Sequence, residues 1–436
     1  MTRPGGVLAA GPALRLPAHR ASSATLAGAY PFLVAPSCTT GVLVGTDALT
    51  GEPFCFDPWD LYAAGALTNP NVLLAGVIGQ GKSALAKSLA LRSIATGRRV
   101  YVPGDPKGEW APVANAVGGI VVRLGPGLPT RLNPLDASAT EPAVVHTQRL
   151  RLLVAVAAVA LHRDLAAVEH AVLDAALTSA AADCPVPTIP DVLAALSRPD
   201  AVAARADAAS VIERVNDGRE LAHGLRRLVR GDLAGLFDGP STQALDPDAP
   251  MVVLDLSALG SDDEALELAM TCASGWLDAA LAGSAGRRWV IYDEAWRLLR
   301  SVPLIRRLQS QWKLSRAYGI ANLLVLHRLS DLDAVGAAGS EARALAEGLL
   351  ADCSTRIVYR QESDQLATTA TALGLTRPER DLLPVLPRGV GLWKMPGRSH
   401  VVRHHLHADE LAVVDTDAAM RGASPAPPQR PPEVAS

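Results

Sequence analysis

The alternation of apolar and polar positions along the chain predicts an α/β protein with a mainly parallel sheet. A short apolar strand is expected at residues 71–75, and helical periodicity follows it at 82–96. Further strands are expected at 99–103, 119–124, 251–256, 289–292, 322–327 and 355–360, and further helices at 262–282, 303–318 and 341–352. Because strands and helices alternate, helices should cover the faces of a parallel sheet.

Three segments depart from this alternation. Residues 137–235 are nearly all helical in pattern, with Ala, Leu and Val at spacings of three and four, which predicts an inserted all-helical subdomain. Apolar runs between turn residues at 31–57 predict a small N-terminal β region. Two final strands, at 389–394 and 400–405, are expected to form an edge hairpin.

These patterns divide the chain into six segments. We expect a flexible N-terminus, a small β region, two parts of one α/β core on either side of the helical insertion, and a disordered Pro-rich tail. Their limits are 1–30, 31–68, 69–136, 137–240 (the insertion), 241–414 and 415–436.

Composition changes this picture in two ways. The net charge of −3 is close to neutral and does not indicate a protein that coats nucleic acid, so any such contact must be a local basic patch. Two arginine clusters, at 226–230 and 297–307, could form such a patch or be ordinary solvated faces. The chain has five lysines against 36 arginines, so a lysine within a motif is a stronger signal than an arginine there.

Cellular location is constrained by the cysteines and by the longest apolar run. Five scattered cysteines without a CxxC pair favour a reducing compartment. The run at 152–161 is about half of the ~20 residues that a membrane span requires. We expect a cytoplasmic protein that docks on a membrane complex through partner proteins.

A phosphate-binding loop follows the first strand of the core. The segment 76–83 matches GxxxxGK[ST], with a strand before it and a helix after it. Glycines let successive backbone N–H groups point inward, and the helix directs its positive end at the anion. The expected ATP-binding residues are Gly76, Val77, Ile78, Gly79, Gln80, Gly81, Lys82, Ser83 and Ala84. Lys82 would reach the β- and γ-phosphates, and Ser83 would bind Mg²⁺.

Two carboxylates end another apolar strand, at Asp293 and Glu294. A phosphate-loop ATPase needs one acid for the Mg²⁺ shell and one group that orients the attacking water. Asp293 fits the first role and Glu294 the second, whereas the alternative is a helix N-cap. Asp255 is the rival acid for Mg²⁺, and otherwise caps the end of its own strand.

Other candidate residues lie near strand ends. His327 is the candidate sensor of the γ-phosphate, or else a histidine bonded to a local carbonyl. Asp105 and Lys107 follow a strand and should lie near the nucleotide, at the sheet edge where such folds bind ligands. Arg316 and Arg356 are candidates to act on the nucleotide of a neighbouring subunit, or else surface arginines.

Several motifs, in order, resemble the VirB-type ATPases of type IV secretion and conjugation, within the HerA–FtsK superfamily. The similar segments are Asn69-Pro70-Asn71 before the phosphate loop, DPKGE at 105–109, Asn133-Pro134-Leu135, FDGP within 236–241, and DEAW at 293–296. The resemblance implies a RecA-like core, a hexameric ring, and Mg²⁺-dependent ATP hydrolysis that drives secretion or DNA transfer. The expected partners are ATP, further copies of the chain, membrane-channel proteins and DNA.

The chain departs from the family pattern at two points. His327 stands where the family usually has glutamine, which puts the turnover rate in question, although a neutral imidazole can also donate a hydrogen bond. About 70 residues precede the phosphate loop, fewer than the family's large N-terminal domain needs. Two alternatives therefore stay open: a DNA-translocating coupling protein, and a nucleotide-binding assembly factor with little turnover.

Overall fold

The computed structural model describes residues 39–136, 141–243, 246, 248–260, 262–281, 286–295, 299, 302–327 and 340–415. Within them lies one sheet of eleven strands. The strands are β1 (Val42–Asp47), β2 (Pro53–Phe56), β3 (Val72–Ala75), β4 (Arg99–Asp105), β5 (Ile120–Arg123), β6 (Met251–Asp255), β7 (Arg288–Tyr292), β8 (Ile320–Leu326), β9 (Thr355–Val358), β10 (Val390–Met395) and β11 (Arg398–His404).

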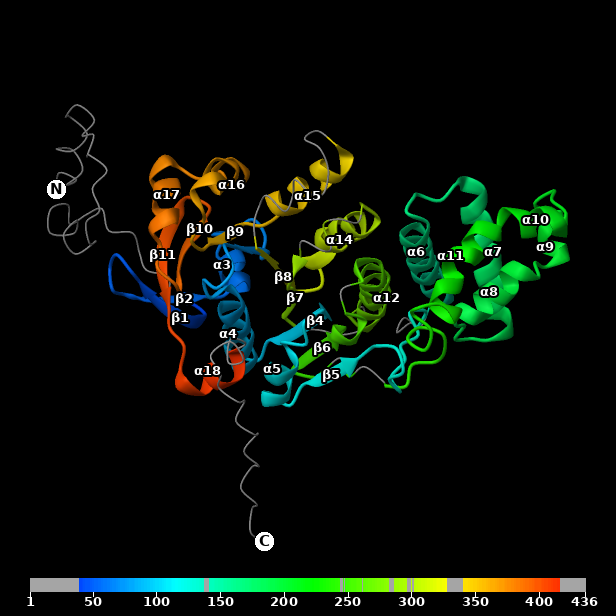
Figure 1. Cartoon of the computed structure of the whole chain (residues 1–436), viewed down its shortest axis with the longest axis horizontal. Coiled ribbons are helices and arrows are strands. Elements are labelled where there is room, and N and C mark those ends of the chain that lie inside the picture. The colour runs from blue at the N-terminus through cyan, green and yellow to red at the C-terminus, as the bar shows by residue number, and fades with distance from the viewer. Residues whose placement is uncertain are drawn as a thin grey trace, which may run out of the picture.

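The sheet is mainly parallel, as the alternation of strands and helices predicts. Its order is β2-β1-β11-β10-β9-β3-β8-β7-β4-β6-β5. The strands from β9 to β5 pair in parallel, whereas β10, β11, β1 and β2 join by antiparallel pairing. The carboxyl ends of β3, β8, β7 and β4 therefore meet at one edge of the sheet (Figure 1).

The expected edge position of the final hairpin is wrong. Strands β10 and β11 do pair with each other, but β1 covers the outer side of β11, with Gly45 opposite His404. Strand β2 then forms the edge beyond β1. The sequence pattern could not show this, because strands at the two ends of the chain find each other only in the folded molecule.

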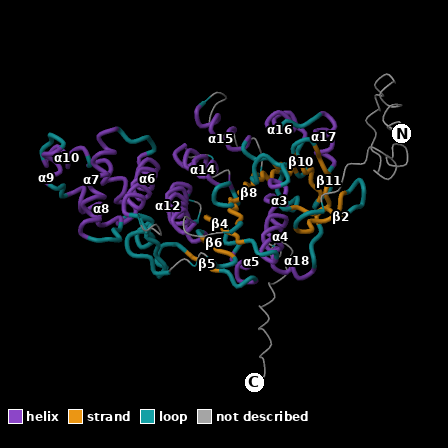
Figure 2. The backbone as a smooth tube through the Cα atoms, turned by 180° about the vertical axis from the view of Figure 1, so that it is seen from behind, coloured by secondary structure: helices purple, strands orange, loops and turns teal. Residues whose placement is uncertain are grey.

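The helices cover both faces of the sheet (Figure 2). Side chains alternate along β3, so Val72 and Leu74 face one apolar core while Leu73 and Ala75 face the other. Helices α3 (Pro58–Ala63), α4 (Lys82–Ala95) and α5 (Ala111–Ala116) pack into the first core. Into the second pack α12 (Asp263–Leu281), α14 (Val302–Ser315), α15 (Glu341–Ala351) and α16 (Leu366–Leu373). Helices α17 (Arg377–Leu382) and α18 (Ala408–Val414) flank the β10–β11 hairpin.

Several helices begin where a side chain caps their first turn. Asp57 accepts hydrogen bonds from the backbone N–H groups of Trp59 and Asp60 at the start of α3. Ser340 caps α15 in the same manner. Helix α4 differs, because its N-cap is Gly81 in the left-handed conformation and no side chain caps it. Its N-terminal N–H groups are left for another acceptor.

The helical insertion forms a separate group of helices at one end of the sheet (Figure 1). Its members are α6 (Pro142–Leu161), α7 (Ala167–Asp183), α8 (Ile189–Ser197), α9 (Ala201–Ala206), α10 (Val211–Asp217) and α11 (Arg219–Arg230). The two segments by which the chain enters and leaves this group of helices lie side by side. The N–H of Leu132 donates to the carbonyl of Leu236, and the N–H of Asn133 donates to Ser241 Oγ. The Asn133-Pro134-Leu135 segment and the segment 236–241, both noted in the sequence, thus hold the two ends of the insertion together.

One helix in the described part of the chain, α6, is long and apolar enough to cross a membrane by length and composition alone. It is longer than the apolar run that the sequence suggests. The same test is passed by core helices of soluble proteins, and Leu152, Leu153 and Val156 of α6 are buried in the core formed with α7, α11 and α12.

Candidate functional site

The loop between β3 and α4 has the backbone that its glycines predict. Gly76, Gly79 and Gly81 have φ values of 156°, 78° and 101°, which side chains with a Cβ rarely adopt. At Gly76 an added Cβ would also lie 2.6 Å from Tyr359 Cβ. The loop is held from both sides, because Val77 N donates to the carbonyl of Arg360 and Gln80 accepts from the N–H of Gly389.

Lys82 is buried beneath this loop, with 4% of its surface exposed. Its Nζ donates to the carbonyl oxygens of Gly76 and Val77, at 2.5 and 2.9 Å. The ammonium group thus lies inside the curve of the loop, beside the N-terminus of α4. An anion at the same place would meet this charge together with the uncapped N–H groups of the helix.

The predicted acid pair ends β7, one strand removed from β3. Asp293 accepts a hydrogen bond from Trp110 Nε1 at 2.9 Å, and burial raises the pKa of its carboxyl group, with the neighbouring Glu294 charge adding to the effect. Glu294 has a left-handed backbone (φ 56°), which costs about 1–3 kcal/mol for a residue other than glycine. Such strain persists where the surrounding structure imposes it.

Glu294, which follows β7, contacts side chains that follow the two neighbouring strands, β8 and β4. His327, directly after β8, lies with Nε2 2.8 Å from Glu294 Oε1. Lys107, in the loop after β4, pairs through Nζ with the same oxygen. Burial lowers the Lys107 pKa, but the hydrogen bond and charge of Glu294 outweigh it, so the pKa is raised. The structure therefore brings together three residues that the sequence singled out separately.

Asp105 shapes the loop that carries Lys107. Its carboxylate accepts from the N–H groups of Lys107 and Trp110, at 3.2 and 2.7 Å. Burial raises its pKa to about 6, against these hydrogen bonds. Asp105 is not among the described residues that line the cavity below, so a direct contact with nucleotide stays a prediction. Asp255, the rival acid, accepts from the N–H and hydroxyl of Ser257, which fits its reading as a strand-end cap.

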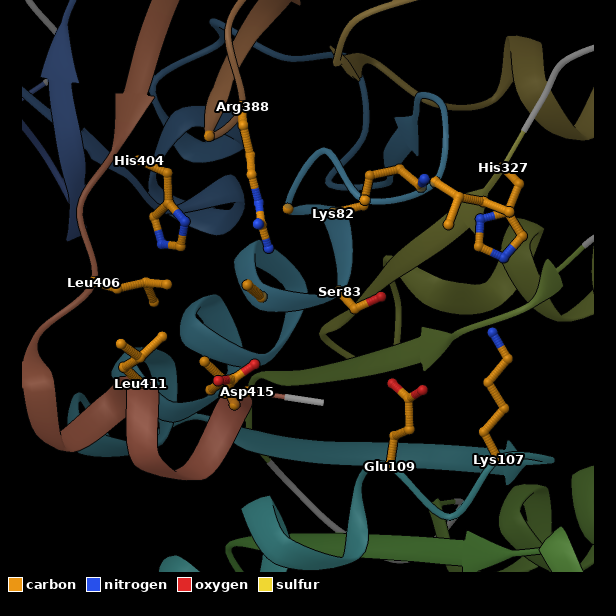
Figure 3. Close-up of a pocket in the computed structure, with 16 residues that line it drawn as sticks. Lys82, Ser83, Lys107, Glu109, His327, Arg388, His404, Leu406, Leu411 and Asp415 are labelled. Atoms are coloured by element: carbon orange, nitrogen blue, oxygen red, sulfur yellow. The ribbon is translucent and has the colours of Figure 1, made fainter. Parts of the chain in front are cut away.

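A cavity of about 410 Å³ opens beside the loop (Figure 3). It is lined on one side by Ile78, Gly79, Gly81, Lys82, Ser83, Ala84, Lys107, Glu109 and His327, and on the other by Arg388, Gly389, His404, Leu406, Leu411, Val414 and Asp415. The first group is polar and positively charged around the helix N-terminus. The second group combines the apolar side chains of Leu406, Leu411 and Val414 with the polar side chains of Arg388, His404 and Asp415.

This second wall is what sequence reasoning missed. Arg388 and Gly389 precede β10, His404 ends β11, and Leu411 and Val414 belong to α18. None lies in a motif, and Arg388 is one of 36 arginines. Glu109 was also missed as a site residue, although it lies in the DPKGE segment. Figure 3 shows its carboxylate pointing toward Ser83.

The two predicted arginines lie elsewhere. Arg316 is exposed in the turn before β8, and Arg356 of β9 donates through Nη1 to the carbonyl of Leu373 at 2.8 Å. Both positions are near the amino ends of parallel strands, and neither is among the described residues that line the cavity. Action on the nucleotide of a neighbouring subunit therefore stays a prediction.

The basic clusters contain arginines with acidic partners. Arg227 contacts Asp232 and Glu264, and Arg306 contacts Asp164 and Glu341. These pairs favour the solvated-face interpretation for the two residues. Arg297 and Arg300 lie outside the described residues, as does Trp296, the last residue of the DEAW segment.

By its sheet order and its glycine loop at the start of α4, the chain has the fold of an α/β P-loop NTPase. No family model matches the sequence, and no curated protein matches it. The structure, however, has clear relatives among solved structures.

The chain is similar to VirB4 of Thermoanaerobacter pseudethanolicus, with a TM-score of 0.68 and 22% identity over 86% of this chain and 98% of that one. It is also similar to the bacterial conjugative coupling protein TrwBdeltaN70, with a TM-score of 0.56 and 15% identity over 86% of this chain and 97% of that one. TrwB in complex with ADP and Mg²⁺ gives a TM-score of 0.56 and 15% identity over 84% of this chain and 90% of that one. The fold expected from the resemblance to VirB-type ATPases is confirmed.

Proposed function

We propose that the protein is a Mg²⁺-dependent ATPase that powers a conjugation or type IV secretion-like transport machine. One observation carries the proposal: the cavity beside the glycine loop has Lys82, Ser83, Lys107 and His327 on one wall, and Glu294 bonds to two of them. A bound triphosphate and a water-orienting carboxylate would thus meet at a single sheet edge.

The cavity suits the two halves of a nucleotide. The phosphates bind the N–H groups of the loop and of the first turn of α4, together with the Lys82 ammonium group. Arg388, which Figure 3 shows reaching into the cavity from the opposite wall, adds a second cation. The nucleoside half lies against Leu406, Leu411 and Val414, which offer an apolar surface to a base.

The residues also fit Mg²⁺, which prefers oxygen ligands and keeps several waters. Ser83 lies in the first turn of α4 on the cavity wall, and Asp293 directly follows β7. The buried Asp293 carboxylate, whose pKa is raised by desolvation, would gain a compensating charge from the ion. When bound, Mg²⁺ would neutralise charge that develops on the phosphate oxygens.

Glu294 and His327 supply the remaining chemistry. The Glu294 carboxylate accepts a hydrogen bond from the attacking water and orients it toward the γ-phosphate. His327 directs the carboxylate through the contact between Nε2 and Oε1, and replaces a glutamine as the polar sensor on this strand. Lys107 and the loop shaped by Asp105 complete the polar end of the site.

The transport role rests on the shared fold with VirB4 and with the conjugative coupling protein TrwB. We place the protein at the cytoplasmic face of the cell membrane, as a ring of identical subunits that contacts membrane-channel proteins. In such a ring Arg316 or Arg356 acts on the neighbour's nucleotide. The likeness to TrwB also supports a second candidate, a DNA-translocating coupling protein.

Steady-state phosphate release separates these functions. The wild type should hydrolyse ATP with Mg²⁺, and both Lys82→Ala and Glu294→Gln should remove this activity. Equal activity in all three proteins would refute the ATPase proposal. Stimulation by DNA that falls steeply with salt would favour the coupling-protein role. Tight ATP binding without turnover, even at high protein concentration, would instead indicate an assembly factor.

A further inference from the structure

Glu109 presents a carboxylate to the phosphate end of the cavity, where bound phosphates would repel it. The residue follows β4 and lines the cavity together with Lys82 and Ser83. Figure 3 shows its carboxylate pointing toward Ser83. Two like charges at this range weaken nucleotide binding unless a cation lies between them. Lys82 already contacts the loop carbonyls and Lys107 contacts Glu294, so the position of Glu109 favours a further cation beside Ser83.

A buried lysine holds one oxygen of Glu109. The side chain of Lys87 is 0% exposed, and its Nζ lies 3.1 Å from Glu109 Oε2 and 5.9 Å from the centre of the Trp110 ring. A buried ammonium group needs a partner for its charge, which ties Glu109 to this place. Lys87 follows Ser83 by four residues in α4, so the two side chains share one face of the helix. The lysine therefore holds Glu109 against the face of α4 that carries Ser83.

The other oxygen of Glu109 is available to a ligand. In the part of the chain that the structure describes, no group donates a hydrogen bond to Oε1, and 26% of the side chain is exposed. An ionised carboxylate oxygen accepts hydrogen bonds and has no proton to donate. Glu109 is thus fixed through Oε2 and offers Oε1 as an acceptor on the cavity side.

Glu109 lies within electrostatic reach of Asp293, the candidate Mg²⁺ acid. Burial raises the Asp293 pKa, the Lys87 charge lowers it, and the Glu109 charge raises it further. Trp110, the next residue after Glu109, donates from Nε1 to Asp293 at 2.9 Å, so the loop that carries Glu109 is fastened to the end of β7. Two carboxylates that follow the neighbouring strands β4 and β7 are therefore held close to each other.

We propose that Glu109 is a positioning residue for Mg²⁺, whose hydration waters donate to its carboxylate, and that Lys87 holds Glu109 in place. This inference rests on the proposed binding of Mg²⁺ and nucleotide. Mg²⁺ bound through one or two protein groups and the phosphates keeps several of its waters. Groups that accept hydrogen bonds from such ligands strengthen metal binding without touching the ion. Glu109 thus repels the phosphates of a metal-free nucleotide and favours the nucleotide that carries Mg²⁺.

The opposite signs of these two effects provide the test. Calorimetry gives the affinity for ADP with excess Mg²⁺ and with EDTA, and the ratio of the two affinities is the gain from the metal. Glu109→Gln keeps the shape of the side chain and a carbonyl oxygen that accepts from Lys87. It should lower the gain about tenfold, because a charged acceptor of the hydration shell is lost. In EDTA the variant should bind ADP as tightly as the wild type or up to about threefold more tightly, since a repulsion is removed.

Two outcomes would overturn the role of Glu109. If the gain from Mg²⁺ is unchanged and only phosphate release from ATP falls, Glu109 acts on the attacking water. If ADP binds more weakly by the same factor with Mg²⁺ and with EDTA, the substitution has damaged the pocket in general.

Lys87 is tested by a double-mutant cycle. Lys87→Met keeps the apolar stem and removes the group that holds Glu109, so the gain from Mg²⁺ should again fall. The Lys87 charge also acts on Asp293, but this effect is equal in the single and double variants that carry Lys87→Met. Adding Glu109→Gln to Lys87→Met should therefore lower the gain by less than about twofold more, against about tenfold in the wild-type background. A tenfold loss in both backgrounds would refute the positioning by Lys87.

A matched control lies outside the cavity. Glu379 pairs with Lys394 at 2.7 Å beside the β10–β11 hairpin, so Glu379→Gln also removes the charge of a glutamate that contacts a lysine. It should leave the gain from Mg²⁺ unchanged. A wild type that binds ADP more tightly with Mg²⁺ but releases no phosphate from ATP would refute the ATPase proposal and leave the role of Glu109 standing. A wild type that binds no nucleotide would overturn both.

Discussion

Arg92 fastens the C-terminal wall of the cavity, so replacing it tests whether that wall belongs to the nucleotide site. From α4, the guanidinium group contacts both oxygens of Glu410 in α18, at 2.6 and 2.7 Å. It also donates to the backbone carbonyls of Leu43, Val44 and His405. One side chain thus holds α18 and the end of β11 against α4 and β1.

The magnitude follows from these contacts. Arg92 and Glu410 are 20% and 17% exposed, so water replaces only part of what is lost. Hydrogen bonds to charged groups contribute about 1.5–3 kcal/mol each, and neutral ones about 1 kcal/mol, without full additivity. Arg92→Met keeps the apolar stem, and we expect it to lower the free energy of unfolding by about 2–4 kcal/mol.

The functional consequence is weaker binding of the nucleoside half. With α18 loosened, Leu411 and Val414 no longer form a fixed wall, so the KM for ATP should rise about five- to tenfold while kcat stays within about twofold. Thermal unfolding and steady-state kinetics measure the two effects. Arg287→Met is the control, since its pair with Asp60 is 41% and 37% exposed and contributes about 0–1 kcal/mol.

The pH dependence gives a second test of the same contact. Burial raises the Glu410 pKa, but the Arg92 hydrogen bond and other contacts outweigh it, so the pKa in the folded protein lies below its ordinary value. The stabilisation is therefore present above the unfolded pKa and lost as pH falls through the folded pKa. Arg92→Met should reduce this acid sensitivity, because Glu410 keeps only its contacts with His407 and Ser88. A variant with normal stability and normal KM would refute the reasoning.

Three further changes test separate parts of the site. Lys82→Ala should lower kcat/KM for ATP by about 100- to 1000-fold, because a preorganised cation inside the loop is lost; unchanged kinetics would exclude this role. His327→Gln should retain kcat within about threefold, since an amide can donate to Glu294, whereas His327→Ala should lower it about tenfold or more. Asp105, with a pKa of about 6 against 3.8 unfolded, stabilises the fold below about pH 4 and loses that contribution as pH rises through 6. Chemical denaturation across this range should show the decline in the wild type and not in Asp105→Asn.

Much of the fold follows from local sequence patterns. The strand before the phosphate loop, the helix after it and the helical insertion are all predicted, because apolar periodicity reports which face of an element is buried. The mainly parallel sheet also follows, because parallel strands need long crossover connections and the repeated helices between strands supply them. The place of the final hairpin does not follow, since β1 and β11 pair across most of the chain.

The candidate site likewise has one part that the sequence predicts and one part that only the folded structure reveals. The sequence by itself determined the glycine loop and the acid pair, because both need particular residue types at particular spacings along one strand and its following turn. Only the tertiary structure decided that Lys107 and His327 both contact the same oxygen of Glu294, because the ends of three strands must first be aligned in the sheet. It also decided the cavity wall from Arg388 to Asp415, whose residues carry no motif and act only by where the chain folds them.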